Sequence, residues 1–405
     1  MRLMISLIST SKFFFILYMV FSQVIKIAVF QSSGMSMIIS YLLLMLAILS
    51  QLVCDKKLII NNAIKIFVLF GVFELLSSLI VATDRYEALS TLFLYFEFML
   101  VMYLINRYVD SDNSIEFPLH AYILTALVMA FFQIFRGAGI KRISISDSLN
   151  VNTVGVQFMF AVGFLLYLFI RKKKTIISIS LYVGIVLLFV YCILLTVSKK
   201  SILGVLVLIV FWALVCYRDA FIRINPFFRI LLVVAIIATG YFAFIMFATR
   251  NASIQDNILL RFSRINDMSD NLSSGMRVRL IEEGFQTFLN HPFLGVGFNN
   301  SRYYNSLSTY THCFYIEVLA CSGAFGTVLF ASGLGTIGSN LRRKKRENNY
   351  VTKIEVDETK YMIVIFWVII ALGAVQIFFY MHNIMYAISV LSSYGYLIYS
   401  NQNQQ

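Results

Sequence analysis

The stretch from Thr175 to Cys216, "TIISISLYVGIVLLFVYCILLTVSKKSILGVLVLIVFWALVC", holds two long apolar runs separated by the short polar sequence "TVSKKS". A helix that crosses the hydrocarbon core of a bilayer needs about 20 predominantly apolar residues. Each run approaches or reaches that length, and the polar sequence between them is long enough only for a tight turn. The stretch therefore predicts two consecutive membrane spans.

The same pattern recurs along the whole chain of 405 residues, which is 60% hydrophobic and 13% charged with a mean hydropathy of +0.81. Soluble domains are about 45–50% apolar and about 25% charged. The composition therefore predicts an all-α polytopic integral membrane protein with about 12 transmembrane helices. The expected spans are 12–30, 35–53, 60–82, 88–106, 118–136, 152–170, 175–196, 200–217, 228–249, 312–338, 361–380 and 383–400.

The net charge of +13 at first suggests a nucleic-acid partner, but the position of the charges argues against one. The basic clusters "RKKK" (Arg171 to Lys174) and "RRKKR" (Arg342 to Arg346) each follow an apolar run directly. Lys and Arg in such loops orient membrane proteins, because the basic loops stay in the cytoplasm. We therefore expect Met1 in the cytoplasm and no nucleic-acid binding.

This orientation divides the chain into three parts. Residues 1–249 form the first nine spans, residues 250–311 form one large extracytoplasmic loop, and residues 312–405 form the last three spans with a basic cytoplasmic loop at 341–360. Within the large loop, "RVRLIEEGFQTFLNHP" places Ile281, Phe285, Phe288 and Leu289 on one face of a short helix. Such an amphipathic helix either lies along the membrane surface or packs on top of the bundle.

Several cations and one histidine are predicted outside the cytoplasm, against the charge bias of the spans. Any one of them could meet lipid phosphate or extend toward water. Taken together they favour a site for an anionic ligand such as a phosphate, which a guanidinium binds in a bidentate manner. The set consists of Lys141, Arg142, Lys199, Lys200, Arg277, Arg279, Arg302 and His312.

The sequence "THCFYIEVLACSG", Thr311 to Gly323, begins one of the last spans with a histidine. On a continuous helix, one stripe holds His312, Ile316, Leu319 and Gly323. Small residues near Gly323 allow a neighbouring helix to approach closely. His312 then lies at the rim of the membrane. A histidine with a pKa near 6.5 is suited to accept a proton there. No CxxC or HExxH spacing indicates a metal site.

These residues resemble the O-antigen polymerase and O-antigen ligase family. That family has an Arg, an amphipathic helix, a Pro-x-x-Gly-x-Gly turn and then His-x-x-Tyr with glycines beyond. The residues at these places are Arg277, Pro292, Gly295, Gly297, His312, Tyr315, Gly323 and Gly326. The segments "LNVNTVGVQFMFAVGF" (Leu149 to Phe164) and "LLTVSKKSILGVLV" (Leu194 to Val207) are similar to two further family segments. In the second, Ser198 matches and Lys199 replaces the family's Arg, which keeps the charge but loses the bidentate geometry.

The resemblance implies a glycosyltransferase that needs no metal or other cofactor, acting at the outer face of the bacterial cytoplasmic membrane. Its donor is a glycan on undecaprenyl pyrophosphate. His312 and Arg277 are the expected catalytic residues, since one can take a proton and the other can stabilise the leaving pyrophosphate. Lys199, Arg142, Arg279 and Arg302 are the expected ligands of the pyrophosphate and glycan. A chain-length regulator and a flippase of the same pathway are candidate partners.

Three functions remain open at this stage. The first is a polymerase that joins lipid-linked oligosaccharide repeat units into O-antigen or capsular polysaccharide. The second is an O-antigen ligase, which moves the finished glycan to a terminal acceptor. The third is a flippase or other transporter, for which ionisable groups within the spans such as Glu74 and Glu97 are typical. The absence of an internal repeat disfavours this third function.

Overall fold

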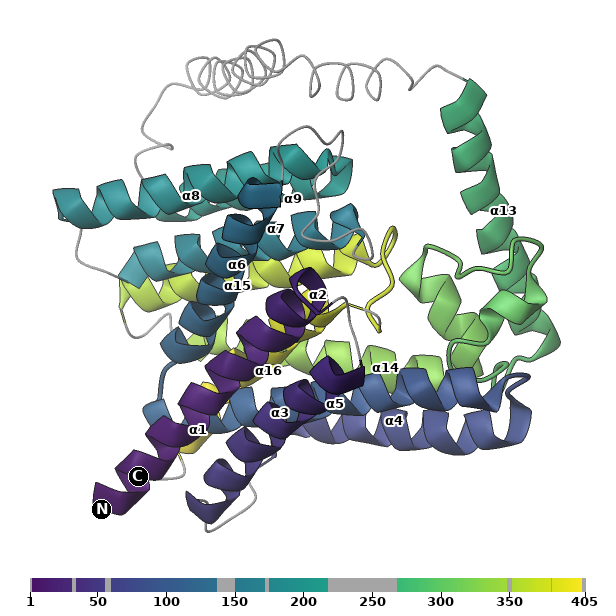
Figure 1. Ribbon diagram of the computed structural model, residues 1–405, viewed down its shortest axis with the longest axis horizontal. Coiled ribbons are helices and arrows are strands. Elements are labelled where there is room, and N and C mark those ends of the chain that lie inside the picture. The colour runs from purple at the N-terminus through teal and green to yellow at the C-terminus, as the bar shows by residue number, and fades with distance from the viewer. Residues whose placement is uncertain are drawn as a thin grey trace.

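The computed structural model describes residues 2–30, 34–54, 60–136, 150–171, 175–217, 268–347, 352–379 and 381–402 (Figure 1). These residues form helices and connecting turns, and they contain no strand. The helices are α1 (Arg2–Val20), η1 (Phe21–Ile25), α2 (Lys26–Ala28), α3 (Gly34–Cys54), α4 (Asn62–Val81), α5 (Arg85–Asp112), α6 (Glu116–Arg136), α7 (Val151–Arg171), α8 (Ile176–Thr196), α9 (Lys199–Cys216), α13 (Met268–Asn290), η2 (Ser301–Tyr304), α14 (Phe314–Glu347), α15 (Lys353–Leu372) and α16 (His382–Gln402).

The all-α polytopic architecture predicted from the sequence is confirmed. In the part of the chain that the structure describes, nine helices are long and apolar enough to cross a membrane: α1 with its extension to Ala28, α3 to α9, and α14. Helices α15 and α16 occupy the last two expected spans, but they are less apolar, and α15 begins with the charged sequence "KIEVDETK". The expected span at 228–249 lies outside the described residues. The count of 12 is therefore not confirmed.

Helix α7 lies at the centre of its part of the bundle, where every side chain from Val154 to Leu168 is buried. Helices α8 and α9 pack beside it and are apolar nearly all round, so many of their apolar side chains are left exposed or partly exposed. Leu181, Leu187, Leu203 and Leu206 are more than half exposed. A helix surface of this composition is matched to lipid tails.

Helix α14 lies along α4 through two glycines, as Figure 1 shows in outline. A Cβ at Gly326 would stand 2.7 Å from the Glu74 carboxylate, and one at Gly333 would stand 2.7 Å from the Phe67 ring. The two helices therefore approach too closely for larger residues at these positions. For Gly326 this confirms the expectation that small residues in this span seat a neighbouring helix.

Gly323 has a different role from the one expected. Its backbone is non-helical, with φ 59° and ψ −166°, and it interrupts α14 instead of packing against another helix. The stripe predicted from His312 through Ile316 to Gly323 is also wrong at its start, because α14 begins at Phe314 and His312 precedes it with a φ of 60°.

The expected amphipathic helix is present as α13, which begins earlier than predicted. Figure 1 shows it running across the direction of α4 and α14 at one end of the bundle, here called the α13 end. It packs through Leu280, Gly284 and Thr287, whereas Phe285 and Leu289 are 43% and 51% exposed. One face of α13, here called its seat and formed by Leu280, Gly284 and Thr287, therefore packs on the bundle, and a separate apolar edge is exposed.

Candidate active site

The Pro292–Gly297 turn is locked into the interruption of α14. Gly295 has a φ of 68°, and a Cβ there would lie 2.3 Å from the Cys321 carbonyl oxygen. A Cβ at Gly323 would lie 2.3 Å from the Phe293 carbonyl oxygen. Because L-residues rarely adopt such positive φ values and no space remains for a side chain, both positions require glycine.

Main-chain hydrogen bonds join the turn to the interrupted helix. They use backbone groups that α14 cannot pair within itself at a break, so the break leaves these groups satisfied. The bonds run from Val296 N to Ala320 O (3.0 Å), from Gly297 N to Cys321 O (3.0 Å) and from Ala324 N to Pro292 O (2.7 Å). This interlock fixes the end of α13 relative to α14.

A buried carboxylate, Glu317, holds the chain that leads to His312. Its Oε2 accepts a hydrogen bond from Thr311 N at 2.9 Å, and its Oε1 accepts one from the Ser301 hydroxyl at 2.7 Å. Glu317 lies in the first turn of α14, and its side chain is 1% exposed. It therefore ties both ends of the 301–311 segment to that helix.

His312 lies between this anchor and the start of α14. Its ring packs edge-on against Tyr310, with centroids 4.3 Å apart, and the next helix is fixed where Phe314 N donates to the Gly373 carbonyl at 2.8 Å. Burial lowers the pKa of His312, and the nearby positive charges of Arg277 and Lys200 lower it further. The imidazole is therefore mainly neutral at pH 7 and able to accept a proton.

Three separate segments bring their basic groups together here, which we call the cation cluster: Arg277 of α13, Lys200 of α9 and His312. Within the described residues, neither Arg277 nor Lys200 forms an ion pair with a carboxylate. Like charges repel, and the first turn of α9 adds the positive end of its helix dipole. Such a site is suited to hold an anion.

The α8–α9 turn delivers Lys200 to the cluster. Val197 has a φ of 51°, and the Thr196 hydroxyl donates to the Ile193 carbonyl at 2.7 Å, which ends α8 sharply. Gly155 of α7 faces this turn, and a Cβ there would lie 2.6 Å from the Ser201 hydroxyl. The two segments that resembled the family in the sequence thus pack directly on each other.

Residues 184–331 match the family model described as O-antigen ligase. This match is consistent with the O-antigen polymerase and ligase family that the sequence resembles. The resemblance predicted from the sequence is thereby confirmed. Members of the family are glycan-transferring enzymes of bacterial membranes. No curated protein matches the chain.

The matched region of the O-antigen ligase model contains all three members of the cation cluster. The structure therefore brings together two expected site residues, Arg277 and His312. The lysine whose charge acts on His312 is Lys200, which the sequence placed among the cations but not among the ligands. Lys199 is exposed in the same first turn of α9, and its role stays a prediction. Arg142 lies outside the described residues.

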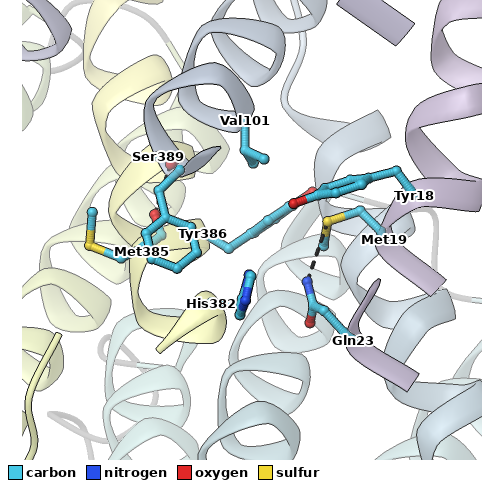
Figure 2. A pocket seen from close by; sticks show the side chains of 9 residues that line it. Tyr18, Met19, Gln23, Val101, His382, Met385, Tyr386 and Ser389 are labelled. Atoms are coloured by element: carbon cyan, nitrogen blue, oxygen red, sulfur yellow. Dashed lines mark hydrogen bonds between the residues drawn. The ribbon is translucent and has the colours of Figure 1, made fainter. Parts of the chain in front are cut away.

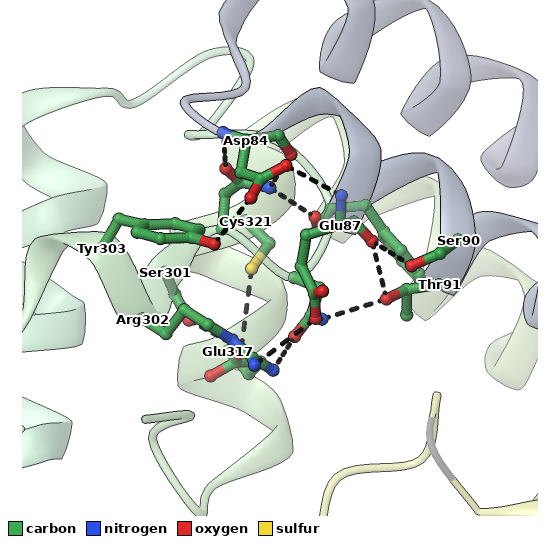
Figure 3. A network of polar contacts seen from close by, with 12 residues as sticks. Asp84, Glu87, Ser90, Thr91, Ser301, Arg302, Tyr303, Glu317 and Cys321 are labelled. Atoms are coloured by element: carbon green, nitrogen blue, oxygen red, sulfur yellow. Dashed lines mark hydrogen bonds and ion pairs between the residues drawn. The ribbon is translucent and has the colours of Figure 1, made fainter. Parts of the chain in front are cut away.

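Arg302 and Arg279 are placed differently, because each is held in an ion pair. Arg302 donates to the Asn299 amide oxygen at 2.5 Å and lies 3.4 Å from the Glu87 carboxylate. Figure 3 shows this network between the 299–303 segment and the start of α5. Arg279 lies 2.8 Å from the Glu283 carboxylate. Their expected role as pyrophosphate ligands remains untested.

The same network anchors the η2 segment to the α4–α5 turn. Asp84 caps α5 by accepting from Glu87 N at 2.9 Å, and it also accepts from the Tyr303 hydroxyl at 3.0 Å. These two hydrogen bonds lower the pKa of the Asp84 carboxyl. The main chain of Asp84 donates to the Asn300 amide oxygen at 2.8 Å. Asp84 and Glu317 are thus structural residues that the sequence analysis did not identify. Their partners are distant in the sequence and meet them only in the folded chain.

The two acidic residues within the spans have separate surroundings. Glu97 accepts a hydrogen bond from the Tyr18 hydroxyl, and Arg107 of the same helix lies 3.0 Å from the Asp110 carboxylate. Tyr18 also lines a small pocket between α1, α5 and α16, where His382 packs edge-on against Phe98 (Figure 2). Glu74 is fully buried against Gly326. Within the described residues, no cluster of His, Cys, Asp and Glu could hold a metal ion.

Proposed function

We propose that this chain is a polymerase that joins oligosaccharide repeat units carried on undecaprenyl pyrophosphate, at the outer face of the bacterial cytoplasmic membrane. The observation that carries the proposal is the cation cluster. Arg277, Lys200 and His312 come from three different segments, and neither Arg277 nor Lys200 forms an ion pair with a described carboxylate. A doubly charged pyrophosphate would complete that arrangement.

The proposed orientation follows from the distribution of basic residues. One basic cluster begins at Arg171, the last residue of α7, and the other, Arg342–Arg346, lies in the last turns of α14; both of these helix ends are remote from α13. Under the positive-inside rule these ends face the cytoplasm, so the α13 end faces outward. That side is where lipid-linked repeat units are polymerised according to the family resemblance.

The proposed reaction transfers a glycan from pyrophosphate to a sugar hydroxyl. The bond between the sugar's anomeric carbon and the phosphate oxygen breaks, and its electron pair leaves with the undecaprenyl pyrophosphate. Arg277 and Lys200 stabilise the negative charge that develops on this leaving group. The acceptor oxygen forms the new glycosidic bond, while His312 takes its proton and later releases it to water.

The surroundings of the cluster fit a lipid-linked donor. Val278 and Phe285 are exposed on the edge of α13, and α9 presents exposed leucines along its length. A polyprenyl tail in the bilayer could therefore lie beside these helices while its pyrophosphate reaches Arg277 and Lys200. The site then needs only a lateral opening toward the bilayer for the donor to enter.

An O-antigen ligase is the second candidate, because the matching family model carries that description. A ligase would use the same donor and the same cation cluster. Only the acceptor would differ, since a ligase transfers the glycan to a terminal acceptor such as the lipid A core.

One experiment separates these functions. Purified protein in detergent is incubated with undecaprenyl-pyrophosphate-linked repeat units, with and without a lipid A core acceptor, and the products are separated by size. A ladder of chain lengths formed without the core acceptor is expected. Glycosylated core without a ladder would identify a ligase, and no glycosidic product under either condition would overturn both functions. A catalytically impaired His312→Asn protein serves as the control.

A further inference from the structure

A groove of about 720 Å³ runs along the polar side of α13. Its volume lies within the range of about 300–1,000 Å³ that is common for ligand sites. It is here called the α13 groove. It is lined by Arg279, Glu282, Glu283, Gln286, Thr287, Asn290 and Tyr304.

The α13 groove is separate from the cation cluster. Its six α13 residues recur at helical spacing on one face, from Arg279 to Asn290, over about 16 Å at 1.5 Å per residue. Arg277 lies on another face of the helix, and the seat formed by Leu280 and Gly284 lies between the two faces. The groove is therefore long enough for an extended ligand and lies on the flank away from the reacting groups.

The walls of the α13 groove are fixed in place. Glu283 lies 2.8 Å from Arg279 Nε and accepts from Ser306 N at 2.9 Å. On the facing wall, the Tyr304 hydroxyl lies 3.0 Å from the Thr83 hydroxyl, and its ring packs edge-on against His291 at 5.5 Å. The site thus exists before any ligand arrives, which reduces the entropy lost on binding.

The chemistry of the lining indicates the class of ligand. One arginine stands against two glutamates, so the groove has no excess of positive charge to attract a phosphate. Gln286 and Asn290 each carry a donor and an acceptor, and their side chains form no hydrogen bond within the described part of the chain. Tyr304 is 40% exposed and offers an aromatic face beside them. Paired donors and acceptors next to an aromatic ring suit a ligand rich in hydroxyl groups with apolar C–H faces.

We infer that the α13 groove binds an oligosaccharide, namely the sugars of the glycan chain that do not take part in the bond-forming step. This inference rests on the proposed function for the identity of its ligand. A chain held there stays on the enzyme between successive additions, so the groove increases the number of units joined before the chain is released, alongside any chain-length regulator.

The test measures glycan binding apart from catalysis. The probe is the free repeat-unit oligosaccharide, released by mild acid from lipid-linked units and added to purified protein in detergent. Binding is followed by saturation-transfer NMR. The parent protein and the His312→Asn protein are expected to bind equally. The double variant Gln286→Ala/Asn290→Ala is expected to bind about tenfold more weakly, since hydrogen bonds from two side chains to the oligosaccharide are lost.

The matched control is Val278→Ser, a substitution of a 55% exposed residue of the same helix outside the groove, which is expected to bind the free oligosaccharide as the parent does. If the alanine pair lowers thermal stability, Gln286→Glu/Asn290→Asp replaces it, because these changes keep the size and remove the amide donors. In the polymerisation assay the groove variants are expected to give shorter chains, with an unchanged rate of the first coupling.

The outcomes distinguish this inference from the proposed function. If the parent makes a ladder but the groove variants bind and polymerise as it does, or if the parent fails to bind the free oligosaccharide, the α13 groove inference is overturned and the polymerase stands. If the parent makes no ladder but binds the free oligosaccharide, and the groove variants alone lose that binding, the groove inference stands and the polymerase is overturned.

Discussion

The two ends of the bundle differ in how their cations are paired with carboxylates. At the end remote from α13, Arg171 lies 3.1 Å from the Glu358 carboxylate, and Lys12 lies 2.6 Å from that of Asp112. At the α13 end, the positive charges of Arg277 and Lys200 act on His312, and neither cation forms an ion pair with a described carboxylate. Ion pairs of the first kind orient helices and contribute modestly to stability. Cations gathered without counter-charges destabilise the empty protein, so the second arrangement points to an anionic ligand.

The same contrast holds within the α13 end. Arg302 and Arg279 are paired with Glu87 and Glu283, whereas Arg277 is not paired with any described carboxylate. If pairing and not proximity decides which cations bind the proposed pyrophosphate, Arg277 binds it and the paired Arg302 and Arg279 do not.

The largest effect is expected at His312. His312→Asn should lower turnover by about 10²–10⁴-fold, the usual contribution of a positioned general base. Asparagine is the right replacement because the residue has a φ of 60°, which Asn tolerates better than Ala, so the backbone is not strained further. Turnover of lipid-linked repeat units and the melting temperature are measured together. A residual rate within a few-fold of the parent would remove His312 from catalysis.

The second prediction compares one cation from each end. Arg277→Gln should lower turnover by about 10²–10³-fold, because one fixed charge at the leaving group is lost. Arg171→Gln breaks the ion pair with Glu358 at the opposite end and should change turnover per folded molecule by less than about twofold. Both rates are normalised to folded protein. Equal losses in the two variants would show that pairing does not separate structural from functional cations.

The sequence predicted the apolar helices, and it selected two residues that the structure brings near each other, for clear physical reasons. Apolar runs of about 20 residues need only local composition to be recognised. Arg277 and His312 stood at recognisable spacings in the family pattern. The family pattern does not show that Lys200, and not Lys199, is the lysine whose charge acts on His312. That depends on the turn at Val197, which precedes α9.

The sequence interpretation of Gly323 failed for a related reason. A glycine in a row of small residues is typical of close helix packing. The positive φ at Gly323 arises where this residue meets the Pro292–Gly297 turn, which contacts the row in the structure but is well separated from it in the sequence. Glu317 was overlooked because its partners, Thr311 and Ser301, are brought to it only by the folded loop.

The third prediction tests whether this interlock supports the cluster. Gly323→Ala should destabilise the protein by about 1–3 kcal/mol through backbone strain alone, and the contact with the Phe293 carbonyl adds to that. Gly335→Ala is the matched control in the same helix, because no atom lies within 4 Å of its added Cβ. It should be neutral or stabilising by up to about 1 kcal/mol. Thermal unfolding in detergent measures both, and equal melting temperatures would contradict the interlock.

The fourth prediction concerns pH. Burial and then the charges of Arg277 and Lys200 lower the pKa of His312, so the free base persists to a lower pH than for an ordinary histidine. Activity falls as pH drops through that pKa, because the protonated ring cannot accept a proton. Lys200→Gln removes one repelling charge, so the acid limb of kcat/KM, which reports on the free enzyme, should move to higher pH. A limb that stays in place or moves lower would separate Lys200 from His312.

The smallest effect is expected at Arg302, although it lies near the cluster. Arg302→Gln removes the ion pair with Glu87 and a hydrogen bond to Asn299, so it should lower stability by about 1 kcal/mol or less. Turnover per folded molecule should stay within about twofold, because the guanidinium is engaged by Glu87 and Asn299 and not by the reacting groups. Thermal unfolding and turnover are compared with those of Arg277→Gln. A loss of turnover close to that of Arg277→Gln, at unchanged stability, would support the role of Arg302 as a pyrophosphate ligand that the sequence first suggested. Pairing with a carboxylate would then not exclude a cation from the site, and the contrast between the two ends of the bundle would lose its meaning for function.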